Sequence, residues 1–322
     1  MSPKRIIKNS IAAIIIGFLL YLAGPRELLQ TLSQLTAATF AYLMLISFLL
    51  IHVSVLKWQL FLQHFSERVS SFRLFNLYLT GYFVNLILPS YLGGDAVRSF
   101  YIGKRVGQHE AAAATILERY TGIVAMLLFA FVFMWQVEAV TWQIKGAVVA
   151  CLAALFTGTI FVLSRGMLQL AGRITVLKPA VPHLDKVRDA LHLARKDRGL
   201  LIKAMSLSFL FHTITVLNTA AAAFAVGWFD PPIWDLFVVL PLILLIGALP
   251  VSPNGLGMQE GAFYFFLHSI GATPAQALGV AVVLRAKSYV LALIGWLSWL
   301  WIKRDDPKRM AEFEKKAAKE AL

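Results

Sequence analysis

The sequence predicts an all-α polytopic membrane protein with about six full membrane spans and two re-entrant helical hairpins. Hydrophobic residues make up 59% of the 322 residues and charged residues only 15%, whereas a soluble domain is about 25% charged. Apolar runs of roughly 20 residues, the length that crosses a bilayer, recur along the chain. Two further apolar runs are short and end in proline and glycine, which is typical of helices that break inside a membrane.

Six apolar runs are long enough to be full spans. The first follows a basic N-terminal segment and lacks a convincing small-residue cleavage site, so we interpret it as a retained helix and not as a signal peptide. Short stretches rich in proline, glycine, aromatic or charged residues separate most of the others. The predicted spans are residues 6–23, 39–62, 111–135, 144–163, 204–226 and 275–301.

The first short apolar run, residues 72–88, favours a re-entrant hairpin over a full span. If it crossed the membrane, Arg98, Lys104 and Arg105 would lie outside, although the other basic clusters are placed in the cytoplasm by the positive-inside rule. A hairpin over residues 72–106 that enters and leaves on the cytoplasmic side removes this conflict.

The second short run lies within residues 233–270. The last span ends at Lys303 and Arg304, which belong in the cytoplasm, so this second hairpin must open from outside. Two broken hairpins that enter from opposite faces indicate an inverted-repeat transporter, although breaks of this kind are common enough that chance similarity is the alternative. We predict one integral membrane domain over residues 1–322, with repeats over about 39–163 and 204–302, a basic cytoplasmic connector over 165–203, an exposed tail over 305–322, and both termini in the cytoplasm.

The net charge of +13 is interpreted as a topology signal and not as a nucleic-acid-binding surface. Most of the basic residues lie near predicted cytoplasmic helix ends, where they would also attract anionic lipid. We count Lys57 among them, with its ammonium snorkelling to the interface. The single cysteine, Cys151, excludes a disulfide or a thiolate metal site within one chain. We predict no metal and no cofactor.

Two stretches, Pro89 to Arg98 and Pro250 to Glu260, carry the residues expected to form a substrate site. In each, Leu-Pro precedes two glycines and then an acid. A break in a membrane helix leaves free N–H groups and a positive dipole end, which together form an anion site. Charges inside a membrane are costly and therefore indicate function. The candidate substrate-binding residues are Ser90, Gly93, Gly94, Asp95, Arg98, Glu118, Arg119, Ser252, Asn254, Gly255, Gly257, Glu260, Arg285 and Lys287.

Spacing predicts how the charges of the first half pair. Asp95 and Arg98 are three residues apart and share one helix face, where Arg98 would be free to grip a phosphate with two hydrogen bonds. Adjacent residues on a helix do not face each other, so Glu118 and Arg119 are expected to have different partners. We predict that Glu118 pairs with Arg98 and that Arg119 pairs with Asp95.

In the second half, Glu260 needs a cation from the last span, either Arg285 or Lys287. The alternative for both halves is that the charges form only structural ion pairs and that the glycines only allow close helix packing.

These motifs resemble those in the transmembrane domain of lysylphosphatidylglycerol synthases. The resemblance implies a helical membrane domain that flips an aminoacylated phospholipid, but relatives look linked to hopanoid or polyprenyl-lipid glycosylation, so the substrate does not carry over. Asn254 replaces a glycine of the family's second motif, and the chain ends at Leu322 without the soluble synthase domain, so we expect no lysyl-lipid synthesis. The matching motifs are Asn85-Leu-x-Leu-Pro89, Gly93-Gly94-Asp95-x-x-Arg98, Glu118-Arg119 and Ser252-Pro253-x-Gly255-Leu256-Gly257-x-x-Glu260-Gly261.

We therefore expect a flippase or transporter that moves a phospholipid or polyprenyl-phosphate headgroup across the cytoplasmic membrane. Its partners would be membrane lipids with anionic or zwitterionic headgroups. No nucleotide-binding motif is present, so transport would be downhill or proton-coupled. Two alternatives stay open: an intramembrane lipid-modifying enzyme, and a scaffold that recruits a partner such as a glycosyltransferase.

Overall fold

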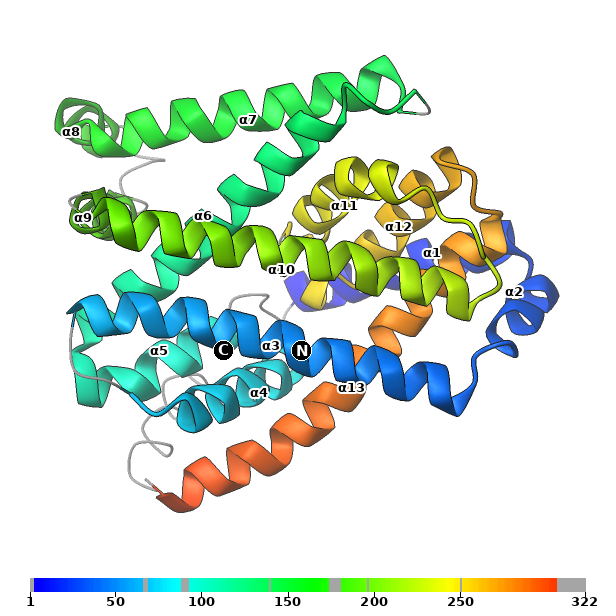
Figure 1. Ribbon diagram of the computed structural model, residues 1–322, viewed down its shortest axis with the longest axis horizontal. Coiled ribbons are helices and arrows are strands. Elements are labelled where there is room, and N and C mark those ends of the chain that lie inside the picture. The colour runs from blue at the N-terminus through cyan, green and yellow to red at the C-terminus, as the bar shows by residue number, and fades with distance from the viewer. Residues whose placement is uncertain are drawn as a thin grey trace.

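The computed structural model describes residues 3–65, 69–87, 93–138, 140–173, 181–195, 197–249 and 251–305. Every regular element within these ranges is a helix (Figure 1). The fold is therefore an all-α polytopic membrane protein, as predicted. Ser90, both prolines that begin the two motifs, and the tail from residue 306 lie outside the described residues.

Five helices are long and apolar enough to cross a membrane. They match five of the six predicted spans, because span length depends only on the length of an apolar run. Figure 1 shows α3 and α10 lying side by side along the long axis, with α13 crossing obliquely. The five are α3 (Ala37–Phe65), α6 (Gln108–Phe133), α7 (Trp142–Leu163), α10 (Arg198–Ala225) and α13 (Pro274–Asp305).

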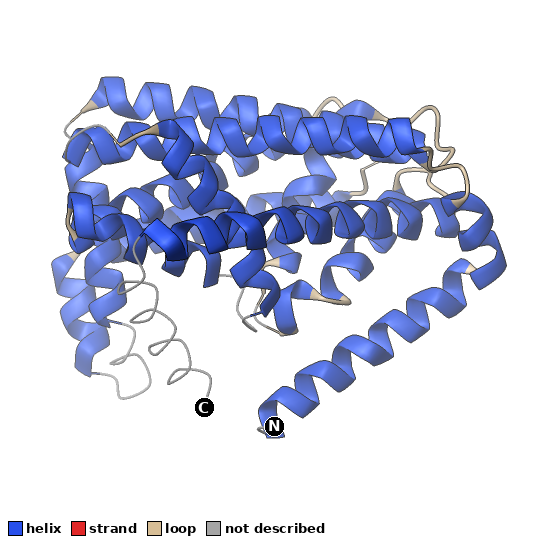
Figure 2. Cartoon of the chain, turned by 90° about the horizontal axis from the view of Figure 1, so that it is seen from below, coloured by secondary structure: helices blue, strands red, loops and turns tan. Residues whose placement is uncertain are grey.

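The first predicted span, residues 6–23, lies within one helix, but this helix is long and apolar enough to cross a membrane only together with the helix that follows it. Helix α1 (Pro3–Ala23) meets α2 (Pro25–Leu32) at an angle of 83°, so the two count as one broken span at most. The break lies at Gly24, whose φ of 72° is easy only for glycine, and Pro25 then begins the next helix. In Figure 2 the helix at the N-terminus runs obliquely to the long helices.

The two predicted hairpins are each a pair of short, packed helices. The first consists of α4 (Ser71–Ile87) and α5 (Gly93–Val106), and the second of α11 (Ile233–Gly247), the one-turn η2 (Pro253–Gly255) and α12 (Met258–Ser269). None of these helices is among the span candidates.

In each hairpin the backbone makes a close contact at a pair of glycines. A Cβ atom on Gly94 would lie 2.6 Å from the carbonyl oxygen of Gly81, and one on Gly255 would lie 2.5 Å from that of Gly247. Only glycine permits backbones to approach this closely. The glycines of both motifs therefore have a packing role.

The basic connector contains two further helices, α8 (Arg165–Arg173) and α9 (Val181–Arg195). Helix α9 packs against α6 and α7. On α8, Leu168 is buried while Met167 and Leu170 are exposed, which is the distribution of an interfacial amphipathic segment.

Candidate functional site

The charged residues of the first half form one compact group, which we call the Arg98 cluster. Arg98 is buried and lies 2.7 Å from Glu118 and 2.9 Å from Asp95. Its guanidinium lies 4.8 Å from the ring centroid of Trp58 and 4.4 Å from that of Tyr78. An arginine can do this because its planar group forms ion pairs at its edge and stacks on its faces.

Arg119 completes the Arg98 cluster from the exposed side. It donates to both carboxylate oxygens of Asp95, at 2.7 and 2.8 Å, and its side chain is 47% exposed. The structure thus contains both predicted pairs, Glu118 with Arg98 and Arg119 with Asp95. Two acids balance two arginines, so the cluster has no net charge.

Arg98 itself is placed differently from the expectation that it would be free to grip a phosphate. Its guanidinium forms ion pairs with two carboxylates and lies against two aromatic rings, and its side chain is only 2% exposed. The free N–H groups expected at the first break are also partly used, because the Gly94 amide donates to the side-chain oxygen of Asn85 at 2.6 Å. In this conformation the protein's own side chains therefore occupy the phosphate site that was expected in the first half. Gly93 is buried as well.

The second break is closed by Arg285, which reaches across from α13. Its Nε donates to Glu260 at 2.6 Å, and its other nitrogens donate to the Asn254 carbonyl and the Gln259 side chain, each at 3.1 Å. Glu260 also accepts from the Gly257 amide at 2.7 Å. The predicted cation for Glu260 is therefore Arg285. Lys287 donates instead to Asn218 on α10, at 2.8 Å.

The residues of the second break adopt left-handed backbone. Asn254 has φ 50°, and Gly255 and Gly257 have φ 67° and 81°. Asparagine tolerates this region better than most residues, so Asn254 can replace the family's glycine without losing the turn. Ser252 is buried, and its hydroxyl has no hydrogen-bond partner among the described residues.

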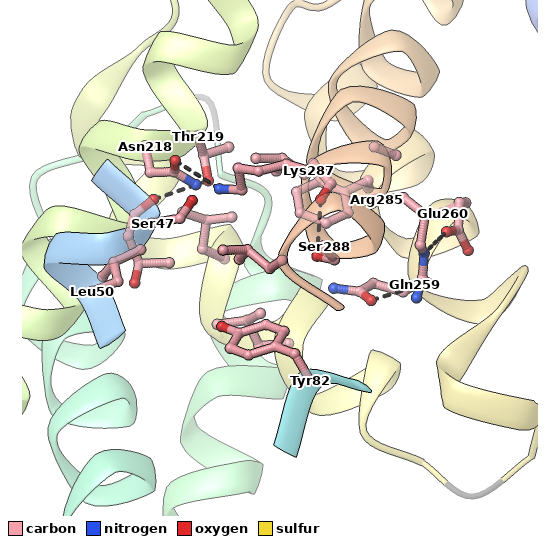
Figure 3. A pocket seen from close by; sticks show the side chains of 17 residues that line it. Ser47, Leu50, Tyr82, Asn218, Thr219, Gln259, Glu260, Arg285, Lys287 and Ser288 are labelled. Carbon is pink, nitrogen blue, oxygen red and sulfur yellow. Dashed lines mark hydrogen bonds and ion pairs between the residues drawn. The ribbon is translucent and has the colours of Figure 1, made fainter. Parts of the chain in front are cut away.

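A cavity of about 150 Å³ lies beside the second break, between α3, α4, α10, α11, α12 and α13. Figure 3 shows Lys287 and Asn218 on one side of it, and Arg285, Glu260 and Gln259 on the other. We call it the central cavity. It brings together Glu260, Arg285 and Lys287 from the predicted set, while no residue of the Arg98 cluster lines it. Its other polar lining residues are Ser47, Tyr82, Thr215, Asn218, Thr219, Gln259 and Ser288.

The predicted site consisted of charged residues and of residues at the two breaks, so it did not include these uncharged polar residues from the middle of other helices. Asn218 could have been predicted as a site residue, because an amide inside an apolar helix needs a buried partner. The hydroxyl residues carried less signal, because serine and threonine in a helix can bond to their own backbone.

Lys57 corrects one expectation. It does not snorkel to the interface but is buried, at 5% exposure, and donates to Ser208 on α10 at 3.1 Å. The reason is that α10 packs along α3 and covers it. Lys57 and Lys287 are thus two buried lysines that both donate to uncharged residues of α10.

No group of three His, Cys, Asp or Glu residues within the described ranges is close enough together to hold a metal ion.

The chain is similar to known membrane proteins over most of its length. The family model described as the Lysylphosphatidylglycerol synthase TM region matches residues 5–295. The chain is 24% identical to a UPF0104 membrane protein of Methanothermobacter thermautotrophicus, over 90% of this chain and 92% of that protein. It is 23% identical to a UPF0104 membrane protein of Methanocaldococcus jannaschii, over 96% and 99%. No solved structure matches it significantly.

Proposed function

We propose a lipid-transport function for this chain, which belongs to the Lysylphosphatidylglycerol synthase TM region family. It would move the headgroup of a phospholipid or polyprenyl-phosphate lipid across the cytoplasmic membrane, through the central cavity. The observation that carries this proposal is the cavity itself, because it places buried charged and amide groups between the hairpin helices and three helices, α3, α10 and α13, that are long enough to span a membrane. Ionisable groups in such a place are costly, so they are candidates for a functional site.

The hairpins support an inverted repeat, the architecture that alternating-access transporters use. Asp95 is the third residue of α5, and Glu260 is the third residue of α12. Each forms an ion pair with an arginine on the long helix that follows, Asp95 with Arg119 and Glu260 with Arg285. The glycine contacts within the hairpins correspond as well.

Helix contacts correspond in the same way. Helices α3 to α6 match α10 to α13, so that α4 against α13 corresponds to α11 against α6, and α3 against α6 to α10 against α13. Because α3 and α10 are counterparts, their direct contact would lie on the pseudo-two-fold axis that relates the two repeats.

This correspondence suggests how the cavity alternates. Leu244, Phe263 and Leu284 line the central cavity. Counted from the matched glycine, acid and arginine, their counterparts are Tyr78, whose ring lies against Arg98, and Arg98 and Glu118 of the Arg98 cluster. The second half therefore has a cavity at the positions where side chains of the first half contact one another. Exchange of the two arrangements would expose the headgroup path to one side and then to the other.

Reconstitution tests the proposal. Purified protein in liposomes that contain a fluorescent phospholipid should let a membrane-impermeant quencher reach the inner-leaflet fluorophores. Ser288→Trp fills the cavity and should abolish this movement. Leu293→Trp is the control, because it introduces the same side chain on the same helix at a position that is 63% exposed.

Two results would contradict lipid transport. One is quenching that Ser288→Trp leaves unchanged. The other is a chemically altered lipid recovered from protein in detergent, where no second leaflet exists, which would favour an intramembrane enzyme. If deleting residues 306–322 alone removed the function in cells and left movement in liposomes intact, a scaffold would be favoured.

A further inference from the structure

The central cavity contains one positive charge that nothing nearby neutralises. Glu260 and Arg285 form an ion pair and cancel each other. Lys287 is 6% exposed, and its one hydrogen-bond partner is the neutral side-chain oxygen of Asn218. No carboxylate of the described residues lies within ion-pair distance of the Lys287 ammonium.

We propose that the central cavity selects a lipid headgroup with a single net negative charge, a phosphodiester linked to a polyol without an amine. This inference rests on the proposed transport function and names its substrate class. A phosphodiester carries one negative charge, which would neutralise the single unpaired ammonium. The family resemblance implies an aminoacylated headgroup, so the charge of this cavity points to a different substrate.

Hydrogen-bond donors for the phosphate come from both sides of the cavity, Lys287 and Asn218 on one side and Gln259 on the other. The Lys287 ammonium has three N–H groups, and the structure gives one of them to Asn218. Because the Asn218 oxygen accepts this bond, its amide nitrogen keeps two donors. Gln259 adds a second amide, whose oxygen accepts from Arg285 and whose nitrogen therefore also remains a donor.

Acceptors for the polyol hydroxyls come from helix-borne serine and threonine residues. Ser47, Thr215 and Ser288 line the cavity, and each hydroxyl donates to the backbone carbonyl four residues earlier. With their protons used, these oxygens offer lone pairs to a ligand. A polyol suits such a wall because each of its hydroxyl groups can donate.

Amine-containing headgroups fit poorly for the same reason. A zwitterionic ethanolamine headgroup has no net charge, so the buried ammonium of Lys287 would still be uncompensated after binding. An aminoacylated headgroup with a net positive charge would add a second cation to a buried site. Like charges in a buried place are strongly unfavourable.

Lipid binding to the whole purified chain tests the inference. Native mass spectrometry would compare retention of phosphatidylglycerol, phosphatidylethanolamine and lysyl-phosphatidylglycerol, added at equal concentrations. We expect phosphatidylglycerol to bind at least about tenfold more tightly than either amine-containing lipid. Lys287→Met should remove this preference, because it removes the unpaired charge. Glycerol 1-phosphate, which has no acyl chains, should not displace the lipid at the same concentration.

The chain offers a matched control and a second variant. Lys57→Met removes a lysine of nearly equal burial that also donates to α10, but Lys57 does not line the cavity, so the preference should persist. Asn218→Asp keeps Lys287 and gives it an internal counter-charge. This variant should lose the preference as Lys287→Met does, which keeps the test decisive if Lys287→Met does not fold.

The outcomes separate this inference from the proposed function. Equal binding of the three lipids, strongest binding of the lysyl lipid, or an equal effect of Lys57→Met would overturn the charge selection, even if lipid movement in liposomes is intact. Displacement by glycerol 1-phosphate would show that a soluble ester is the ligand. Selective binding without any movement in liposomes would support the site and contradict transport.

Discussion

Removal of Arg285 should destabilise the protein far more than removal of its counterpart, Arg119. The Arg285 side chain is 13% exposed and its partner Glu260 is 9% exposed. Substitution by methionine leaves that carboxylate buried without a cation, which costs ~3–5 kcal/mol. The substitution also removes hydrogen bonds to Asn254 and Gln259. For a chain of this size we expect the apparent melting temperature to fall by roughly 10 °C.

Arg119→Met is the matched comparison. The Arg119 side chain is 47% exposed, and Asp95 keeps its second partner, Arg98. Exposed ion pairs contribute ~0–1 kcal/mol, so the melting temperature should fall by no more than about 4 °C. Both variants would be measured by thermal unfolding in the same detergent.

A double variant tests the stated cause. If the cost of Arg285→Met comes from an unpaired carboxylate, adding Glu260→Gln should recover part of it, with a coupling energy of about 2 kcal/mol. Additive losses in this cycle, or equal shifts for Arg119→Met and Arg285→Met, would refute the reasoning.

Three further predictions concern the hairpins and the Arg98 cluster. Gly94→Ala should cost ~1–3 kcal/mol in thermal unfolding, because its Cβ would lie 2.6 Å from Gly81, whereas Gly146→Ala on α7 has nothing within 4 Å and should be neutral or stabilising. Tyr78→Phe should cost ~1–2 kcal/mol by removing its 2.6 Å bond to Glu118, and Tyr42→Phe at an exposed site should cost almost nothing. In a Cys151→Ala background, single cysteines at Ser70, just before α4, and at Arg105, in the last turn of α5, should both react with an impermeant maleimide from the cytoplasmic side. Labelling from opposite sides would mean that this segment crosses the membrane.

Several features of the fold and the site could be predicted from local properties of the sequence. An apolar run of sufficient length becomes a span wherever it packs, so five of the six spans were predicted correctly. The pairing of Arg98 with Glu118 and of Arg119 with Asp95 followed from helix spacing and from the cost of leaving a charge unpaired in an apolar environment.

Other features depend on which helices pack together. The burial of Lys57 could not be predicted, because its partner Ser208 is 151 residues away on α10. The pairing of Lys287 with Asn218, 69 residues away, has the same cause. The angle between α1 and α2 could not be predicted either, although Gly24 and Pro25 indicated where the helix breaks.

The sequence by itself therefore determined five of the long apolar helices and which charges pair in the first half, while it left two candidates for the cation that pairs with Glu260. Only the tertiary structure decided that α10 packs against both α3 and α13, and hence that a cavity with one unpaired ammonium forms beside the second break. The physical reason is that lipid is as apolar as the helix faces, so hydrophobicity places a helix in the membrane but does not choose its neighbours. That choice depends on close contacts between small and polar residues, which become neighbours only in the folded chain.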